Sequence, residues 1–496
     1  MNKHRFLSAL LALLMLSATA VGCGSDTGVN DPATETADGN TTDEAVETSV
    51  LDTLDYGNET FTIRMSNSIL SSHEMMVGPE EAKGDEIDIA TYNRNMEVEE
   101  RLGVKFAYEY TDNNWDTVAA SARQYIMSGE DTFDLIVDDQ LGLSTVAAEG
   151  LFVNALDCKY FDFDEDCWWY DYMKEISVGN DEIYMLVGDY FINVLDRAFV
   201  IYTNMDILND AVGMTKEELY QTVLDGNWTY DKFNELITKA YNDENGNTVR
   251  DSDDRYGLLI SNKAGSMISF VYSSDIQFIT RDEDGYPELS MNGERAQQVF
   301  EKLRTITTNE STRFNNVGMD TSDQTTMFMN GQGLFVVDSC FADFKKLRDM
   351  KYDLGLVPYP KVDENQESYN TTMWDVSEVG VIPTTAKDPD MSSAVVQALC
   401  EASKEILIPA YYETALKVKY TRDDITARVI DLIYDNINGS FPLVYNNRSA
   451  NGIFLDSITK PLQNGGDGIA SAYAELEPGA ITQLQELVDL YKDREQ

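Results

Sequence analysis

Asp138 and Asp139 are the side chains whose type and position best suit contact with a polar ligand. They follow the apolar run Phe133–Val137, so we expect them at the carboxyl end of a buried strand, where open α/β sheets bind their ligands. Ser66 and Asn67 hold the equivalent place after an earlier strand. These carboxylate, hydroxyl and amide groups would hydrogen-bond to the hydroxyl groups of a polar solute. The alternative for either aspartate is a structural role as the N-cap of a helix.

Aromatic side chains provide a second kind of contact, because their faces stack on the apolar faces of sugar rings. Trp374 and Asp375 lie in a polar stretch, where a tryptophan has little reason to belong to a core. Trp168 and Trp169 have the same chemistry, and a structural plug is their alternative role. The ligand contacts expected from the second set of alternating strands and helices, which begins after Asn204, are Asn262, Tyr272 and Ser339.

Catalytic chemistry is not expected from this sequence. Of its two histidines, only His73 lies beyond the first 22 residues. This excludes metal sites built from several histidines, and a Ser-His-Asp triad would have to recruit this one residue. Neither an HExxH nor a GxSxG sequence occurs. We therefore expect a protein that is not an enzyme and has no catalytic residue.

One stretch has the spacing of a calcium-binding loop. Asp243, Asn245, Asn247, Asp251 and Asp254 stand at positions 1, 3, 5, 9 and 12, which carry oxygen ligands in EF-type loops. The glycine that such a loop needs at position 6 is absent, and position 12 is not a glutamate. We expect a solvated turn and no cofactor, with a weak structural calcium site as the alternative.

The first 23 residues have the pattern of a bacterial lipoprotein leader. Lys3 and Arg5 precede the apolar stretch Phe6–Leu16, which is shorter than the ~20 residues of a membrane span. The four residues that end at Cys23 resemble a lipobox. We expect residues 1–22 to be a cleaved signal peptide and Cys23 to be acylated, which would anchor the protein to the outer face of the cell membrane. An ordinary cleaved leader is the alternative.

Composition bounds the remaining possibilities. Residues 23–57 are rich in small polar and acidic residues and predict a disordered tether. The whole chain has a net charge of −50, which disfavours binding to nucleic acid. Its 496 residues exceed the ~250 to 300 that one core serves, so two or more domains are expected. Beyond Cys23, four cysteines are too few for a disulfide scaffold; Cys158 and Cys167 could pair or remain free thiols.

The elements that must position these residues alternate between strand and helix. Phe61–Met65 and Val104–Tyr110 have the period of two that is typical of strands, and the helix between them should end at Gly103. A further helix should end at Gly129, before the strand Phe133–Val137. Such alternation predicts a parallel sheet covered on both faces. Further strands are expected at Glu182–Val187, Ala198–Thr203, Tyr256–Ile260, Gly333–Val337, Leu354–Val357 and Val379–Ile382, and further helices at Asp390–Ser403, Asp424–Asn436 and Ala480–Tyr491.

A set of short motifs carries a resemblance to a known family. They are Asn93-Arg94-Asn95, Glu99–Val104, Gly129–Leu135, Trp168-Trp169 ahead of Gly188-Asp189, Tyr202-Thr203-Asn204, Trp228–Phe233, Asp254–Gly257, Phe328–Gly331 and Gly355–Pro360. Each is weak alone, but their order and spacing after a lipoprotein leader resemble extracellular solute-binding protein family 1 of ABC importers, the maltose-binding-protein-like family. The resemblance covers residues 58 to about 403.

The resemblance implies an α/β protein with two lobes of the periplasmic-binding type II class, which close on a solute in the cleft between them. We expect residues 58–195 plus 338–403 to form lobe 1, and residues 196–337 plus 404–496 to form lobe 2. The chain would then cross between lobes near Leu195–Arg197 and Val337–Ser339. Closure about a few such residues is the usual motion of these proteins.

The implied function is capture of a small polar solute, an oligosaccharide above all, and its delivery to an ABC transporter membrane permease. The expected partners are thus the solute, the permease and the membrane reached through the lipid anchor, and the expected state is a monomer. Two alternatives remain open. One is a secreted glycan hydrolase that uses two of the many carboxylates; the other is a glycan sensor or adhesion protein that transports nothing.

Overall fold

The computed structural model describes residues 49–66, 76, 78–79, 81–111, 117–129, 133–261, 264–291, 293–315, 321–347, 349–375, 377–417 and 424–494. The leader, Cys23, most of the tether, Asn67, His73 and Asn262 lie outside these residues. In the described part of the chain, none of the helices combines the length and the hydropathy that a membrane span requires.

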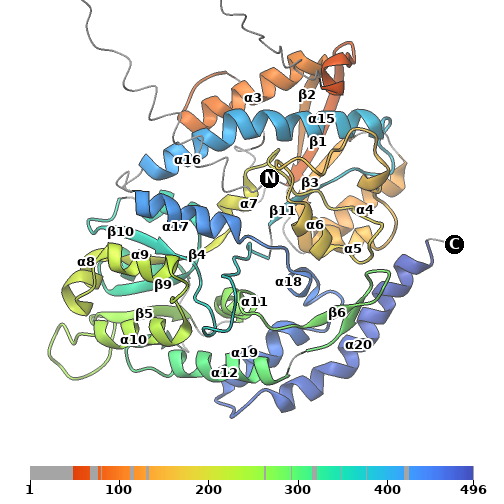
Figure 1. Ribbon diagram of the computed structural model, residues 1–496. Helices are drawn as coiled ribbons and strands as arrows, with labels where there is room; N and C mark the ends of the chain where they lie inside the picture. Colours follow the sequence, from red (N-terminus) through yellow and green to blue (C-terminus); the bar gives the residue numbers. More distant parts are fainter. Residues whose placement is uncertain are drawn as a thin grey trace, which may run out of the picture.

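The first described sheet has the strand order β11-β3-β1-β2 (Figure 1). β1 (Glu59–Ser66) is parallel to both β2 (Val104–Thr111) and β3 (Leu135–Asp139), as the alternating pattern predicts. β11 (Glu378–Val381) runs antiparallel to β3 and closes that edge. The helices around this sheet are α3 (Glu86–Leu102), α4 (Val118–Ser128), α5 (Gln140–Ala147) and α15 (Pro389–Ala402), with α3 packed on α15 and α4 packed on α5.

A second described sheet has the order β10-β4-β9-β5-β8. Its strands are β4 (Phe199–Asn204), β5 (Tyr256–Ser261), β8 (Thr312–Asn315), β9 (Gly333–Cys340) and β10 (Leu354–Val357). β4 is antiparallel to both of its neighbours, whereas β5 is parallel to β8 and β9. Its helices include α9 (Lys216–Leu224), α10 (Tyr230–Ala240), α12 (Gly293–Thr307) and α13 (Thr321–Met329). Two sheets, each with its own helices, confirm the two-lobe α/β fold that we predicted.

Smaller elements connect and flank the sheets. They are α6 (Tyr170–Ile176), α7 (Asn193–Asp196), α8 (Met205–Ile207), α11 (Ile268–Tyr272), α14 (Phe344–Leu347) and the hairpin β6 (Ile279–Arg281) and β7 (Pro287–Leu289). The strand expected at Glu182–Val187 pairs only at Leu186, whose backbone exchanges hydrogen bonds of 2.7 and 3.0 Å with Gly380 of β11.

Local sequence explains where the helices begin and end. α3 begins at a capping box formed by Asp85 and Asp88, and it ends at Gly103, which has a φ of 64°. A residue with a side chain would be strained in this left-handed conformation, so glycine suits the position. α4 ends in the same way at Gly129, and Thr229 accepts a hydrogen bond from Lys232 N–H to cap α10. These four helix ends follow rules that can be applied to the sequence alone.

Three described segments of chain run side by side between the two sheets. Arg197 and Phe199 exchange backbone hydrogen bonds of 3.0 Å with Trp374 and Thr372 respectively, which pairs the first crossing with the second. Thr371 in turn bonds through its backbone to Asn436 and Asn438 in the third crossing. A bundle of three short extended segments has few side chains to repack when it bends, so we place the hinge here.

The lobe boundary expected between residues 337 and 338 is wrong. Both residues lie inside β9, which pairs with β4 across Val200–Ser339 and with β5. The chain then adds β10 to the same sheet before it returns to the first lobe near Thr371. The sequence marks β10 as a strand but does not say which sheet it joins, because strand pairing is a long-range contact.

The assignment of residues 404–496 to lobe 2 also needs correction. α16 (Ile408–Lys417) packs on α3 of lobe 1, whereas α17 (Asp424–Asp435) packs on α9 of lobe 2. α18 (Phe441–Tyr445) contacts α5 and α6 on one side and α11 on the other. α19 (Ile453–Asn464) packs on α20 (Ala470–Lys492), and Arg494 after α20 returns to Ala147 and Glu182 of lobe 1. The C-terminal helices therefore join the lobes, as Figure 1 shows.

A buried arginine organises lobe 1. The Arg94 side chain, on α3, is fully buried. One terminal nitrogen, Nη1, donates to Tyr190 O at 2.7 Å and to Ser403 Oγ at 2.9 Å, and Nη2 donates to Met76 O at 2.7 Å. Burial lowers its pKa to about 10, which still leaves the guanidinium charged at neutral pH. Burying a cation costs less when hydrogen bonds satisfy its donors, and the bonds that do so here tie Arg94 to three distant segments.

Arg94→Ala should lower the free energy of unfolding by about 3 kcal/mol, because it leaves buried carbonyl groups without donors and creates a cavity. Arg123→Ala is the control. Arg123 pairs with Glu149 at the surface, where both side chains are 33% exposed, and its loss should cost under ~1 kcal/mol. Urea unfolding measures both differences, and equal effects of the two substitutions would contradict the organising role of Arg94.

Candidate functional site

A cavity of about 600 Å³ lies where the lobes meet the hinge. Lobe 1 contributes α6, lobe 2 contributes α11 and the chain up to β6, and the second and third crossings supply the floor. The side chains that line it are mostly charged or polar. They include Lys174, Glu175, Tyr272, Asp275, Arg281 and Thr372.

Arg281 holds the lobe 1 wall of the cavity in place. Its guanidinium donates to the backbone carbonyls of Glu175 at 2.6 Å and Ser177 at 2.9 Å, at the end of α6. A third bond, 2.7 Å long, goes to Gly285 O in the β6–β7 turn. Burial lowers the pKa of Arg281, and the charge of Glu175 partly offsets this. Since its donors are committed to the backbone, Arg281 positions the wall more than it offers charge to a ligand.

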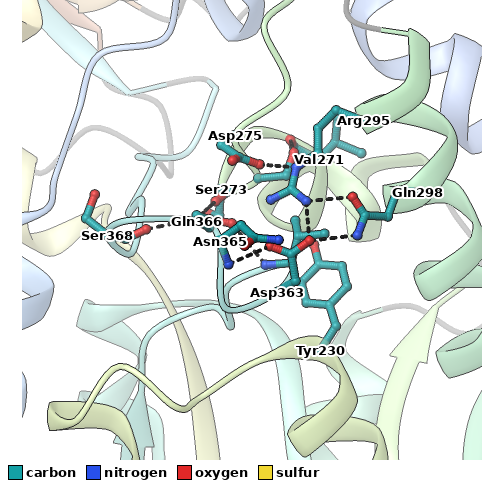
Figure 2. A network of polar contacts seen from close by, with 12 residues as sticks. Tyr230, Val271, Ser273, Asp275, Arg295, Gln298, Asp363, Asn365, Gln366 and Ser368 are labelled. Atoms are coloured by element: carbon teal, nitrogen blue, oxygen red, sulfur yellow. Dashed lines mark hydrogen bonds and ion pairs between the residues drawn. The ribbon is translucent and has the colours of Figure 1, made fainter.

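A polar network holds the lobe 2 wall (Figure 2). Arg295 on α12 pairs with Asp275 in the cavity wall and donates to Asp363 Oδ2 at 2.6 Å. Gln298 donates to the same oxygen at 2.7 Å. Gln366 donates to Ser273 O at 3.2 Å, which fastens the loop after β10 to the end of α11. The network fixes the cavity wall and the start of the second crossing to one rigid body.

Two hydroxyl groups remain for a ligand at this cavity. Within the described residues, neither Tyr272 Oη nor Thr372 Oγ1 has a hydrogen-bond partner, although both atoms are buried. Burial raises the pKa of Tyr272 well above its usual value, and the charge of Asp375 adds to the shift. A buried hydroxyl without a partner is costly, so both groups are suited to bonding a polar ligand.

Ser66, Asp138 and Asp139 come together at the carboxyl end of the first sheet, where we expected them. Ser66 Oγ donates to Asp138 at 2.7 Å across the β1–β3 pair. Asp139 accepts from Leu141 N–H at 2.7 Å and from Gly142 N–H, so it caps α5, which is the structural alternative weighed for it.

Two charged residues that the sequence did not single out complete this group. Glu378 lies opposite Asp139 in the β3–β11 register, and Arg197 Nε is 3.9 Å from Glu378 Oε2. Burial raises the pKa of Glu378 to about 8, and Asp138 and Asp139 add to this while Arg197 opposes it. Burial likewise raises the pKa of Asp139 to about 7. No local motif marks this cluster, since it depends on the pairing of strands far apart in sequence.

The tryptophans have different environments. Trp168 is 2% exposed, and its Nε1 donates to Gln397 at 2.8 Å; Trp169 is also buried and donates to Asp189 at 3.2 Å. Both rings are buried, which favours the structural role over stacking on a ligand. Trp374 is only partly buried, and its ring lies 6.0 Å from that of Phe199 in the hinge.

The remaining predicted contacts are less closely grouped. Asp375, with Trp374, sits beside Gln140, whose side-chain amide donates to both backbone carbonyls at 3.2 Å. Tyr272 lines the cavity. Ser339 is 5% exposed within β9 and paired with Val200, a position that belongs to the sheet and not to the cavity. The prediction that Ser339 contacts a ligand is therefore not supported.

Most side-chain oxygen atoms of the calcium-like loop accept hydrogen bonds from nearby residues, whereas Asp254 Oδ1 has no partner among the described residues. Asp243 accepts from Gly246 N–H at 2.7 Å and Thr248 N–H at 2.8 Å, and Asp251 accepts from Asn247 at 2.8 Å. Asn245 accepts from Asn247 N–H, and Asp254 accepts from Tyr241 Oη. Among the described residues, no group of three or more His, Cys, Asp or Glu side chains is placed to hold a metal ion.

The free energy of unfolding should fall as pH rises from about 4 to about 8. An unfolded glutamate releases its proton near pH ~4.3, whereas folded Glu378 holds it to about pH 8, so the folded state binds the extra proton in this window. Glu378→Gln should make this pH-dependent fall in the free energy of unfolding smaller, by an amount on the order of 2 kcal/mol. Glu81→Gln, at an exposed site, controls for removing one carboxylate. Denaturant unfolding at pH 5 and pH 8 measures this, and an unchanged slope in Glu378→Gln would contradict it.

Comparison with known proteins shows the fold. No protein-family model matches the sequence, and no curated protein sequence matches it with significance. Among solved structures, a cyclo/maltodextrin-binding protein in complex with maltotetraose matches with a TM-score of 0.54 at 12% identity, over 88% of this chain and 98% of that one.

Two further structures are an ABC transporter solute-binding protein from Thermotoga lettingae bound with α-D-tagatose and one from Agrobacterium radiobacter in complex with ribitol. Their TM-scores are 0.54 and 0.51, with identities of 12% and 14% over 86% of this chain and 100% and 99% of theirs. The chain therefore has the fold of the ABC transporter solute-binding proteins, which maltodextrin-binding proteins share.

Proposed function

We propose that this chain is an extracytoplasmic solute-binding lipoprotein of an ABC importer. It captures a small polar solute, with an oligosaccharide as the first choice, by closing its two lobes, and it passes the solute to a membrane permease. The observation that carries the proposal is the cavity of about 600 Å³ at the junction of both lobes and the hinge, lined by polar groups. Ligand sites of this kind span about 300 to 1,000 Å³.

The chemistry of the cavity favours a neutral ligand. Arg281 is committed to backbone carbonyls, Lys174 pairs with Asp171 at 2.8 Å, and Asp275 pairs with Arg295. The charges at the cavity are thus largely compensated within the protein. Tyr272 and Thr372 offer hydroxyl groups that have no partner in the described part of the chain. Groups that both donate and accept hydrogen bonds suit a polyhydroxylated ligand.

The location of the site also supports capture by closure. Its walls belong to different lobes, and its floor consists of crossing segments, so a ligand that bridges the walls would bind the closed state better than the open one. A ligand shifts a conformational equilibrium only through such differential contacts. The leader and Cys23 support the proposed lipid anchor and the outer membrane face as the location.

Two alternatives make different predictions for the same ligand. A glycan hydrolase would cleave the bound glycan. Among the described residues near the hinge, the acidic cluster of Asp138, Asp139 and Glu378 is the candidate site for such cleavage. A sensor or adhesion protein would bind the glycan intact without supporting its uptake. Mass spectrometry of the recovered ligand tests the first alternative, because a hydrolase would return a cleaved glycan. Glycan uptake by a strain that lacks the protein tests the second, because deletion of a sensor or adhesion protein would leave uptake unchanged.

Thermal unfolding against a panel of oligosaccharides, monosaccharides, polyols, amino acids and peptides should give a saturable rise in melting temperature with one carbohydrate class. A ligand at a hundred times its dissociation constant adds ~2.7 kcal/mol, which such scans resolve. Shifts only with peptides or amino acids would keep a binding protein but contradict the carbohydrate. A panel without any shift would contradict the proposed function.

Tyr272→Phe should weaken binding of the ligand so identified by about tenfold, the effect of one lost hydrogen bond of ~1.4 kcal/mol. Tyr445→Phe is the control, because Tyr445 is also a buried tyrosine but does not line the cavity. Calorimetric titration measures both affinities. Equal affinities in the wild type and Tyr272→Phe would remove this hydroxyl from the site.

A further inference from the structure

Cys167 and Cys400 lie side by side, although 233 residues of sequence separate them. Both are buried free thiols, with 1% and 0% exposure. Burial raises the pKa of the Cys400 thiol well above its usual value, and a hydrogen bond with the Cys167 thiol adds to this. Nothing in the ligand site uses either residue.

Contacts on both sides of the pair fix this placement independently. Residues 397, 400 and 404 lie at helical spacing on one face of α15 and the turn that follows it. Trp168 Nε1 donates to Gln397 Oε1 at 2.8 Å, and Asp166 forms an ion pair with Lys404. Cys167 lies between Asp166 and Trp168, and Cys400 lies between Gln397 and Lys404, so the two cysteines occupy the same point of the contact.

The backbone beside the pair is equally close. Asp189 N–H donates to Cys167 O at 2.9 Å, and Trp168 forms a bridge with Gly188. A Cβ atom at Gly188 would lie only 2.8 Å from Cys400 Sγ. The Cys400 sulfur therefore faces the backbone of the segment that carries Cys167.

Cys158 is held at the other end of the same helix. Lys159 N–H donates to Asp390 Oδ1 at 3.4 Å, in the first turn of α15, and Asp162 N–H donates to Gln397 Oε1 at 3.0 Å farther along. The segment thus runs along the helix from residue 390 toward residue 404. The ten residues between Asp390 and Cys400 span ~15 Å of helix, which separates Cys158 from Cys167. Pairing of Cys158 with Cys167, left open by the sequence, would require this segment to rearrange.

We propose that Cys167 and Cys400 form a disulfide bond when the protein meets an oxidising environment. The S–H bonds of the two thiols break and their sulfurs join, and the two protons and two electrons pass to an external small-molecule disulfide, whose S–S bond breaks to give two thiols. The bond would fasten the segment before α6 to α15. Because Asp171, Lys174 and Glu175 of α6 line the cavity, the disulfide would hold one wall of the site to the core of lobe 1. The inference does not depend on which ligand binds.

The test uses the full chain with Cys23→Ser, unfolded, reduced, and refolded in a buffer of reduced and oxidised glutathione so that burial does not limit access. Thiols are then blocked with N-ethylmaleimide under denaturing conditions, and peptides are mapped without reductant. We expect one cross-linked peptide pair that contains Cys167 and Cys400, two hydrogens lighter than its parts, with Cys158 and Cys340 alkylated. A Cys158–Cys167 bridge, a glutathione adduct alone, or alkylation of all four cysteines would overturn the proposal.

Stability gives a second readout that does not rely on peptide recovery. The oxidised protein should melt a few degrees above the reduced protein, because the crosslink closes a long loop. Cys400→Ser should abolish this difference, and Cys158→Ser should retain it. Amide exchange in α6 should be slower in the oxidised form of the Cys158→Ser protein and insensitive to redox state in Cys400→Ser. If the melting difference between oxidised and reduced protein persisted in Cys400→Ser, it would come from other thiols, which would contradict the proposal.

Discussion

The burial of one positive charge sets the geometry of lobe 1. Desolvation of a guanidinium is so unfavourable that Arg94 can stay inside only while carbonyl and hydroxyl oxygens surround it. Those oxygens belong to Met76, Tyr190 and Ser403, from three separate parts of the chain. Tyr190 begins the path to the first crossing, and Ser403 ends α15. The requirement to satisfy a single side chain thus places both the start of the hinge and the helix that covers the first sheet.

The hinge itself depends on backbone pairing. The three crossings bond to each other through main-chain groups at residues 197–199, 371–374 and 436–438. The Arg295 network fastens lobe 2 to the second crossing, and Arg281 of β6 donates across to the backbone at the end of α6 in lobe 1. The proposed closure would require the short crossings to bend and the Arg281 bonds between β6 and α6 to change.

The cavity and the acidic cluster differ in how their charges are compensated. Near the cavity, the cations bond to carbonyls or paired carboxylates, so little net charge remains for the ligand. At the carboxyl end of the first sheet, Asp138, Asp139 and Glu378 are buried together, and the resulting rise in pKa keeps a proton on the cluster. The carboxylates first expected to contact the ligand are thus largely occupied by one another and by the α5 cap.

The sequence by itself determined the elements. Period-two and helical patterns located β1, β2, α3 and α15, and Gly103 and Gly129 marked helix ends, because burial and backbone conformation are local properties. The family resemblance supplied the two-lobe fold. The tertiary structure alone decided that β10 joins the second sheet, that Trp168 and Trp169 are buried, that Glu378 meets Asp139, and that Cys400 meets Cys167. It also decided the cavity, which is built from α6, α11 and two crossings. Each of these depends on which surfaces pack together over long sequence separations, and no local pattern encodes that choice.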